Sequence, residues 1–194
     1  MRLTKMIFVF VVLLLGYTVN SYNFELGSPK IEEPTTIEEK YKVIQEWSHS
    51  LKEKGLISIS PDSFAKAAII VMWCESGLET KSQDRLGSQG LNQLLPSTRK
   101  LIGAPVDIRN KSFREHLEYF EDYLILTGKS QQIQCSIDLH ALNFAPSRFH
   151  KEVFCKTSKG LKALDKNKDG VISRQDLHLF QQKRIFKNKF ISNL

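Results

Sequence analysis

The stretch that decides the fold is SPDSFAKAAIIVMWCESG, residues 60–77. Ser60 and Pro61 are typical of the first residues of a helix, and the apolar residues that follow are spread around nearly its whole circumference. Such a helix must be covered by other elements, so we expect it to lie deep in the core. It ends at the tripeptide ESG, residues 75–77, which places a carboxylate where the chain leaves the core.

Amphipathic helices flank this stretch in the sequence. Thr36 and Glu39 have capping-box spacing, and the apolar residues after them fall on one helical face as far as Gly55. Residues 112–128 repeat the same arrangement, with a capping box at the start and a glycine at the end. These patterns predict two helices that each turn one apolar face toward the buried stretch.

The remaining segments predict short elements. A short helix is expected after Pro96 and another from Asp138 to Phe144, whereas the polar residues 81–90 predict a loop or a small hairpin. No alternation typical of strands is found at any length. The expected fold class is therefore mainly α, either all-α or α with one small hairpin.

A chain of 194 residues, 41% of them hydrophobic, can bury one core with little more than a short appendage.

The N-terminal residues predict export. Residues 1–21 place Arg2 and Lys5 before an apolar run, which indicates a signal peptide or a retained membrane anchor. Residues 22–35 combine Gly, Pro and charge without an apolar period, so we interpret them as a linker.

The net charge indicates the class of partner. The formal net charge of +7 suits a polyanionic partner, but the basic residues lack interleaved aromatic residues, so nucleic acid is not expected.

The cysteines allow two interpretations. Because exported thiols can be oxidised, Cys135 and Cys155 could form a disulfide, with Cys74 as the unpaired thiol. The alternative is three buried thiols that act as small apolar side chains.

Glu75 is the candidate catalytic residue. A carboxyl at the end of a buried helix is partly desolvated, which raises its pKa and suits a general acid at neutral pH. On position alone, the alternative is a helix-end charge that faces water. The following sequence favours catalysis, because ESG at 75–77 is followed by a variable loop, by GLNQ at 90–93 and by LPST at 95–98.

These segments, in this order, resemble the soluble lytic transglycosylase family, which is related to goose-type lysozymes. The resemblance implies a lysozyme-like helical fold with Glu75 on the wall of a cleft, and peptidoglycan glycan strands as the substrate. It implies cleavage of the bond between N-acetylmuramic acid and N-acetylglucosamine with a 1,6-anhydro product. Glu75 would protonate the glycosidic oxygen, and the N-acetyl group of the substrate would stabilise the positive sugar.

The resemblance also proposes residues that contact the substrate. Three segments, FREHLEYFEDYL at 113–124, DLHALNFAP at 138–146 and GLKALDKNKDGVI at 160–172, resemble a phage-associated branch of these proteins. That branch usually has Tyr where this chain has His140, which would act as a donor near Glu75 or simply pack against the core. The substrate-binding candidates are Ser76, Asn92, Gln93, His140 and Asn143.

A loop near the C-terminal end has the spacing of an EF-hand. Its oxygen-bearing side chains fall at positions 1, 3, 5 and 12 of twelve, with Gly170 at position 6. Position 12 is Asp instead of Glu, so we expect a structural calcium ion bound with modest affinity, or a tilt toward magnesium. A polar turn without metal is the alternative. The candidate metal ligands are Asp165, Asn167, Asp169, Val171 and Asp176.

Together these features predict a monomeric peptidoglycan lytic transglycosylase, exported to the periplasm or anchored in a membrane. Residues 36–160 would form a lysozyme-like catalytic domain, and residues 161–194 an EF-hand-like calcium loop with a C-terminal helix. The phage-like branch implies a place in a virion membrane and a role in cell-wall penetration or lysis. One alternative is a hydrolytic lysozyme of the same fold, for which the loop residue Asp84 would be a second carboxylate or simply a solvated side chain. The other is a non-catalytic wall-binding or virion structural protein, which would not need a partly buried acid.

Overall fold

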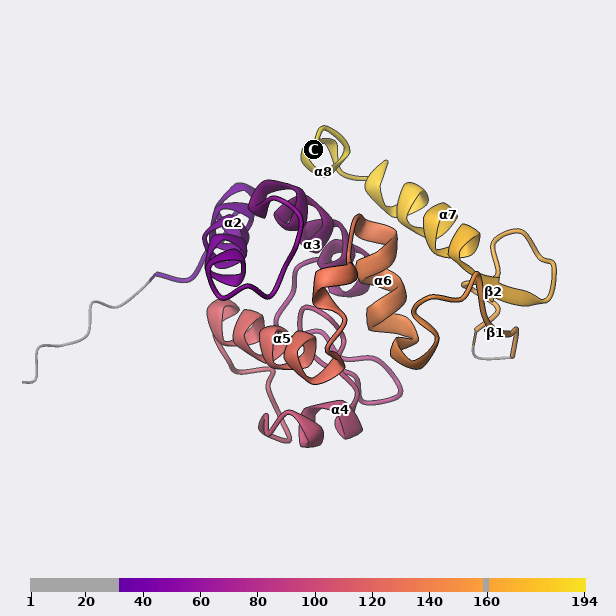
Figure 1. Cartoon of the computed structure of the whole chain (residues 1–194), viewed down its shortest axis with the longest axis horizontal. Coiled ribbons are helices and arrows are strands. Elements are labelled where there is room, and N and C mark those ends of the chain that lie inside the picture. Colours follow the sequence, from indigo (N-terminus) through magenta and orange to yellow (C-terminus); the bar gives the residue numbers. More distant parts are fainter. Residues whose placement is uncertain (1–31, 159–160) are drawn as a thin grey trace, which may run out of the picture. The chain divides into compact units, whose positions relative to one another are not determined.

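The computed structural model describes residues 32–158 and 161–194 (Figure 1). The predicted export segment, residues 1–21, and residues 22–31 of the predicted linker at 22–35 lie outside them. Residues Glu33–Leu194 form one compact unit. Its α-helices are α2 (Ile37–Glu53), α3 (Pro61–Ser76), α4 (Pro96–Leu101), α5 (Phe113–Thr127), α6 (Ser136–Phe144), α7 (Arg174–Ile185) and α8 (Lys189–Ser192). The mainly α class is confirmed.

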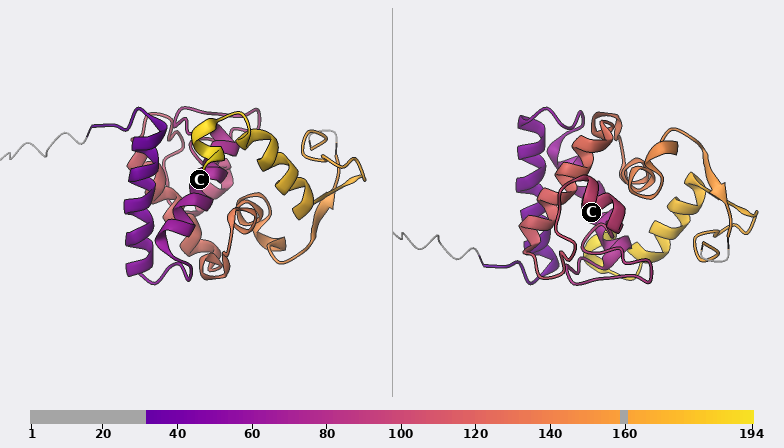
Figure 2. Two further views of the ribbon diagram at one scale, coloured as in Figure 1. Left: turned by 90° about the horizontal axis from the view of Figure 1, so that it is seen from above. Right: turned by 90° about the horizontal axis from the view of Figure 1, so that it is seen from below.

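Helix α3 lies in the core. Helices α2, α6 and α7 all pack against it, and Figure 2 shows it among the other helices from two sides. Burying a large apolar side chain contributes about 1.5–3 kcal/mol, so this helix supplies much of the hydrophobic stabilisation. Its buried residues are Phe64, Ala65, Ala67, Ala68, Ile69, Val71, Met72 and Cys74.

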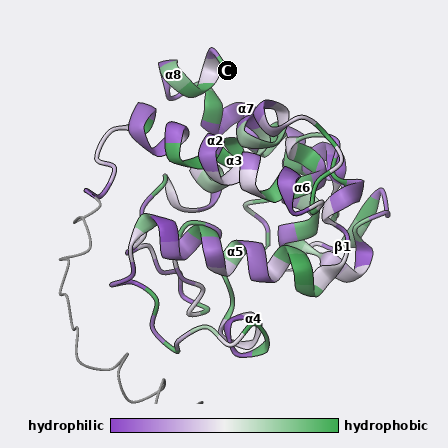
Figure 3. Cartoon of the chain, turned by 60° about the vertical axis from the view of Figure 1, so that its left-hand side comes forward, coloured by the Kyte–Doolittle hydropathy of each residue, from purple (hydrophilic) through white to green (hydrophobic). Residues whose placement is uncertain are grey.

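Both predicted capping boxes are present. At the start of α2, the Thr36 side chain accepts a hydrogen bond from the backbone N–H of Glu39, and the Glu39 side chain accepts one from the backbone N–H of Thr36. Ser112 and Glu115 form the same pair of bonds at the start of α5. Figure 3 shows polar and apolar residues alternating along α5, as expected of a helix with one face in the core. Trp47 of α2 packs against both α3 and α5, because its ring lies 5.8 Å from that of Phe64 in α3 and 6.0 Å from that of Phe120 in α5.

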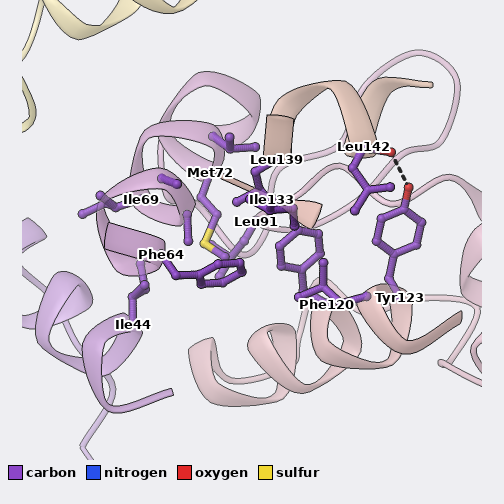
Figure 4. Close-up of a cluster of buried hydrophobic side chains, with 14 of the residues drawn as sticks. Ile44, Phe64, Ile69, Met72, Leu91, Phe120, Tyr123, Ile133, Leu139 and Leu142 are labelled. Atoms are coloured by element: carbon purple, nitrogen blue, oxygen red, sulfur yellow. Dashed lines mark hydrogen bonds between the residues drawn. The ribbon is translucent and has the colours of Figure 1, made fainter. Parts of the chain in front are cut away.

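A hydrogen bond also connects α5 to α6 within this core. The Tyr123 hydroxyl donates to the carbonyl of Leu142 at 2.7 Å, and Figure 4 shows this bond at the edge of the buried cluster. Since Tyr123 is buried, its hydroxyl would be costly to leave unpaired. The bond holds the last turn of α6 against α5.

The structure contains a small sheet that the sequence analysis missed. Strand β1 (Val153–Lys156) pairs antiparallel with β2 (Val171–Ser173), with an irregularity between Val153 and Cys155. Strands of this length are too short to show an alternating pattern, which is why the only hairpin expected from the sequence was at residues 81–90 and this one was not predicted. In the loop at 81–90, isolated bridges from Gln83 to Gln89 and from Gln89 to Leu94 take the place of a regular hairpin.

Helix α7 packs on the core rather than forming a separate unit. It contacts α3 and α6, and the indole of Trp73 donates to the carbonyl of Arg184 at 3.2 Å. At its other end, Arg174 donates to Asp138 at 2.7 Å and to the carbonyl of Phe149 at 2.7 Å. None of the helices in the described ranges has the length and hydropathy that a membrane crossing needs.

The cysteines fit neither expectation. All three are free, so the proposed bridge between Cys135 and Cys155 is absent from the structure. Only Cys74 is buried, and burial raises the pKa of its thiol to about 12. Cys74 therefore packs as a small apolar side chain, while Cys135 is exposed and Cys155 is half-buried.

Candidate functional site

A hollow of about 390 Å³ lies at the C-terminal end of α3. It contains the predicted acid, Glu75, together with two of the predicted substrate-binding residues, Gln93 and Asn143. Its other lining residues are Asp84, Leu86, Ser88, Leu94, Leu95, Thr98, Tyr123, Phe144, Pro146 and Leu161. Segments far apart in the sequence thus meet around one carboxylate.

The two oxygens of the Glu75 carboxylate have different surroundings. Oε1 accepts a hydrogen bond from Asn143 Nδ2 at 3.0 Å and lies 3.2 Å from His140 Nε2. Oε2 has no hydrogen-bond partner among the described residues, and it is not among the enclosed polar atoms that lack one. The side chain is 22% exposed, so one oxygen is held by the protein and the other is left for a ligand.

Asn143 joins three elements at this point. Its Nδ2 atom donates both to Glu75 Oε1 and to the carbonyl of Asn92, each at 3.0 Å. The amide therefore connects α6 to the end of α3 and to the loop after it. Because both protons of the amide are used, Asn143 fixes the acid and has none left on Nδ2 for a substrate.

His140 lies behind the acid. It is 2% exposed and does not line the hollow. Its Nδ1 atom lies 3.1 Å from Gln181 Nε2, and its ring packs 5.8 Å from that of Phe180. His140 is thus packed in the core, as one of the two alternatives required, and its Nε2 lies 3.2 Å from Glu75 Oε1.

The loop that carries Gln93 is held by a buried guanidinium. Arg99, only 3% exposed, donates to the carbonyls of Gly87, Leu94 and Val106 at 3.0, 2.5 and 3.0 Å. Gln93 has a φ of 49°, which is unusual for a residue other than glycine, and its Nε2 donates to the carbonyl of Gly90 at 2.9 Å. These bonds give the loop one defined path along the hollow.

Gly90 allows this loop to approach α5 closely. Its φ is +78°, and a Cβ at this position would lie 2.3 Å from two ring atoms of His116. The His116 ring, which is 3% exposed, occupies the space that any side chain would need. The glycine of the GLNQ segment is therefore required by packing as well as by its backbone conformation.

The other two substrate-binding candidates are directed elsewhere. The Ser76 hydroxyl donates to the carbonyl of Met72 at 3.0 Å, within its own helix. Asn92 is 3% exposed, and neither polar atom of its side chain has a hydrogen-bond partner among the described residues. Neither residue lines the hollow.

The predicted metal loop is folded by its own polar side chains. Asp165 Oδ2 accepts from Gly170 N at 3.2 Å and from Thr157 Oγ1 at 2.8 Å, and Asp169 Oδ1 accepts from Val171 N at 3.0 Å. No group of three or more His, Cys, Asp or Glu side chains within the described ranges is placed to hold a metal ion. One feature does fit a cation, because Asp165 Oδ1 is enclosed and has no hydrogen-bond partner among the described residues.

Asp176, at position 12 of this loop, is used as a helix cap. Its Oδ1 accepts from Lys166 N at 2.6 Å, and its Oδ2 accepts from Ser173 N at 3.0 Å and Ser173 Oγ at 2.7 Å. Burial acts to raise the pKa of Asp176, but these bonds together with one from Asn167 hold it below its ordinary value. Both oxygens of this carboxylate therefore accept hydrogen bonds that hold the loop against the start of α7.

A larger hollow of about 540 Å³ lies elsewhere, between residues 33–34, 78–81 and 109–115. Four of its charged groups are paired with one another, since Lys40 lies 3.6 Å from Glu79 and Lys111 lies 2.9 Å from Glu115. It contains none of the predicted site residues. Size alone would favour this hollow, but the chemistry favours the one at Glu75.

Two residues of the site were missed in the sequence. Gln181 and Arg99 act from helices whose local patterns carry no sign of a functional role, and each is recognised only through contacts with distant segments. Comparisons with family models, with curated proteins and with solved structures found no match to this chain. A function is therefore inferred from the residues and their geometry.

Gly90→Ala should destabilise the protein strongly. The added methyl group meets the His116 ring and an unfavourable positive φ, so we expect the free energy of unfolding to fall by about 2–4 kcal/mol in urea titrations. Gly87→Ala is the matched control, because Gly87 has the same φ of +78° but its Cβ would lie 3.4 Å from Pro96. Equal losses in the two variants would show that contact with His116 is unimportant.

His116 should make stability depend on pH near neutrality. Burial lowers the pKa of His116 below its ordinary value of about 6.5, so the unfolded chain binds a proton that the folded chain resists. Stability is then complete above the unfolded pKa and falls as pH drops toward the folded pKa, by up to about 1.4 kcal/mol per pH unit. Hydrogen bonds hold the pKa values of Glu39, Asp107 and Glu115 at about 2, outside this window.

Urea titrations at about pH 7.5, 6.5 and 5.5 measure this dependence. The slope should shrink in His116→Gln and persist in His178→Gln, which changes an exposed histidine. An identical slope in the parent and in His116→Gln would contradict the assignment.

Proposed function

We propose that this protein cleaves the glycan strands of peptidoglycan as a lytic transglycosylase, with Glu75 as its catalytic acid. The observation that carries the proposal is the arrangement of the Glu75 carboxylate. Oε1 is engaged by Asn143 and His140, whereas Oε2 is free of protein partners within the described ranges and belongs to a side chain that lines the hollow. The motif from Glu75 to Thr98 supports the choice of reaction.

The proposed reaction needs one carboxyl group. Donors at Oε1 favour negative charge on that oxygen, so the proton of the neutral acid resides on Oε2. Oε2 gives this proton to the glycosidic oxygen as the sugar bond breaks, and the N-acetyl group of the substrate stabilises the positive sugar. The C6 hydroxyl of the same sugar then attacks C1, closes the 1,6-anhydro ring and returns its proton to Glu75.

The lining of the hollow suits an amino sugar. Leu86 and Leu95 are exposed at 75% and 44%, and with Phe144 they give the hollow apolar surface against which the C–H face of a pyranose ring can pack. Gln93 adds an amide to the same lining. The formal net charge of +7 complements the carboxylates of peptidoglycan stem peptides.

Hydrolysis by a lysozyme of the same fold is the second candidate. Asp84 favours it, because this second carboxylate lines the same hollow as Glu75. Its Oδ1 accepts from Leu86 N and Ser88 N, each at 2.8 Å, which ties it to the turn of the loop. Hydrolysis gives reducing ends and transglycosylation gives anhydro ends, so the products distinguish the two reactions.

We also propose that calcium stabilises the loop at 165–176. Asp165 Oδ1 is the ligand that the geometry supports best, and Asn167, Asp169 and the carbonyl of Val171 would complete an oxygen site. A calcium ion bound there would supply positive charge to an enclosed carboxylate oxygen and takes no part in the glycan chemistry. Asp176 would contribute by holding the loop closed.

The resemblance to a phage-associated branch suggests where the activity is used. We propose an exported or membrane-anchored protein that acts as a monomer on the cell wall during penetration or lysis. The segment on which export depends, residues 1–21, lies outside the described residues. A non-catalytic wall-binding role is the remaining alternative.

Glu75→Gln should abolish most cleavage while keeping the fold. An amide of the same shape cannot donate the proton, so release of muropeptides from purified sacculi should fall by about 10²–10⁴. Glu79→Gln is the control, since it makes the same change on a side chain that is 69% exposed and four residues away. Mass spectrometry of the parent's products should show 1,6-anhydro ends. Release by Glu75→Gln at the parent's rate would rule out Glu75 as the acid.

Calcium should raise the melting temperature, because an ion that binds only the folded loop stabilises it by mass action. At 100 times the dissociation constant the gain is about 2.7 kcal/mol, which corresponds to about 5 °C or more for a chain of this size. Asp165→Asn should lose most of this rise, whereas Asp122→Asn, on the exposed side of α5, should keep it. The same melting temperature with calcium and with chelator would contradict calcium binding by this loop.

A further inference from the structure

We propose that Gln181 of α7 is a positioning residue for the acid, because it holds His140 in the tautomer whose Nε2–H donates to Glu75. The catalytic consequence rests on the function proposed for Glu75. The hydrogen-bond arrangement does not, and it can be measured separately. The proposal makes a helix from the last part of the sequence a component of the site.

The orientation of the Gln181 amide is set by Ser136. The Ser136 hydroxyl donates to Gln181 Oε1 at 2.9 Å, and Gln181 Nε2 donates to the carbonyl of Ser136 at 3.1 Å. A backbone carbonyl can only accept, so the atom that faces it must be the nitrogen. The reversed amide would place two oxygens 3.1 Å apart with no proton between them. Ser136 therefore determines which end of the amide faces His140.

The same nitrogen fixes the tautomer of His140. Gln181 Nε2 lies 3.1 Å from His140 Nδ1 and donates to it, so Nδ1 must be the acceptor. A neutral imidazole carries one proton, which is then on Nε2, the ring atom that lies 3.2 Å from Glu75 Oε1. The ring therefore faces Glu75 as a neutral N–H group and not as an imidazolium. A second proton, on Nδ1, would face the N–H of Gln181.

This arrangement decides which oxygen of the acid carries its proton. Asn143 donates to Oε1 and the Nε2–H of His140 lies 3.2 Å from it, so a proton on that oxygen would face two N–H groups, and the neutral acid carries its proton on Oε2. Gln181 and His140 are 3% and 2% exposed, where hydrogen bonds are little weakened by competing water. Gln181 thus acts on the acid through His140, which lies 41 residues before Gln181 in the sequence.

The test changes Gln181 to a residue that accepts where the amide donates. In Gln181→Glu, the carboxylate should draw a second proton to Nδ1, so that His140 becomes an imidazolium beside Glu75 and keeps that acid ionised. Cleavage of sacculi near neutral pH should then fall at least about ten-fold, which is less than the 10²–10⁴ expected for loss of the general acid itself. Gln182→Glu is the matched control, because it adds the same charge at an adjacent, exposed residue of α7.

The imidazole nitrogens are observed directly by ¹⁵N NMR, with the signals of His140 identified by their loss in His140→Gln. The unmodified protein should show a proton on Nε2 alone, Gln182→Glu should match it, and Gln181→Glu should show protons on both nitrogens. A proton on Nδ1 in the unmodified protein would overturn the proposal, whatever the activity. If Gln181→Glu fails to fold, Gln181→Met removes the donor and keeps the length, and full cleavage by a folded Gln181→Met would also overturn it.

Failure of this proposal and failure of the proposed function give different results. Cleavage by Gln181→Glu at the rate of Gln182→Glu, with Glu75→Gln inactive, would reject the positioning role and leave Glu75 as the acid. Equal cleavage by the parent and Glu75→Gln would reject Glu75 as the acid. In that case the proton positions on His140 still decide whether Gln181 sets the hydrogen bond.

Discussion

A helix that is apolar on nearly every side is stable in water only when other elements surround it, and α3 imposes this requirement on the rest of the chain. Helix α2, which precedes α3 in the sequence, packs against it, and so do helices α6 and α7, which follow it. The chain must therefore return twice to the same helix after the loop at residues 78–95. Every element that meets this requirement also passes close to the end of α3, where Glu75 lies.

Polar groups at that end cannot be left unpaired, because an unsatisfied buried donor or acceptor costs about 1–3 kcal/mol. Hydrogen bonds run from Ser136 through Gln181 to His140, whose Nε2 lies 3.2 Å from Glu75 Oε1, and Asn143 donates to the same oxygen. All of these side chains come from helices that the core already holds in place. The acid is thus supported by a rigid polar network inside apolar packing, and its free oxygen is the part that the network leaves open.

Much of the fold could be predicted from local patterns. The capping boxes at Thr36 and Ser112 fix helix starts through contacts within four residues, and the placement of Glu75 in the last turn of a buried helix follows from the apolar run before it. The strand pairing of β1 with β2 could not be predicted, because it depends on contacts between segments without a periodic signal. The role of Gln181 could not be predicted either, because an isolated glutamine on an amphipathic helix is ordinarily a surface residue.

The contact between α3 and α7 joins segments far apart in the sequence, since Trp73 and Arg184 are 111 positions apart. A ribosome makes α3 early and α7 late, so a growing chain carries the acid long before it carries the helix that covers one side of it. During that interval an apolar side of α3 has no permanent partner, which is the condition under which chaperones bind nascent chains. The order of synthesis therefore delays completion of the acid site until almost the whole described chain has been made.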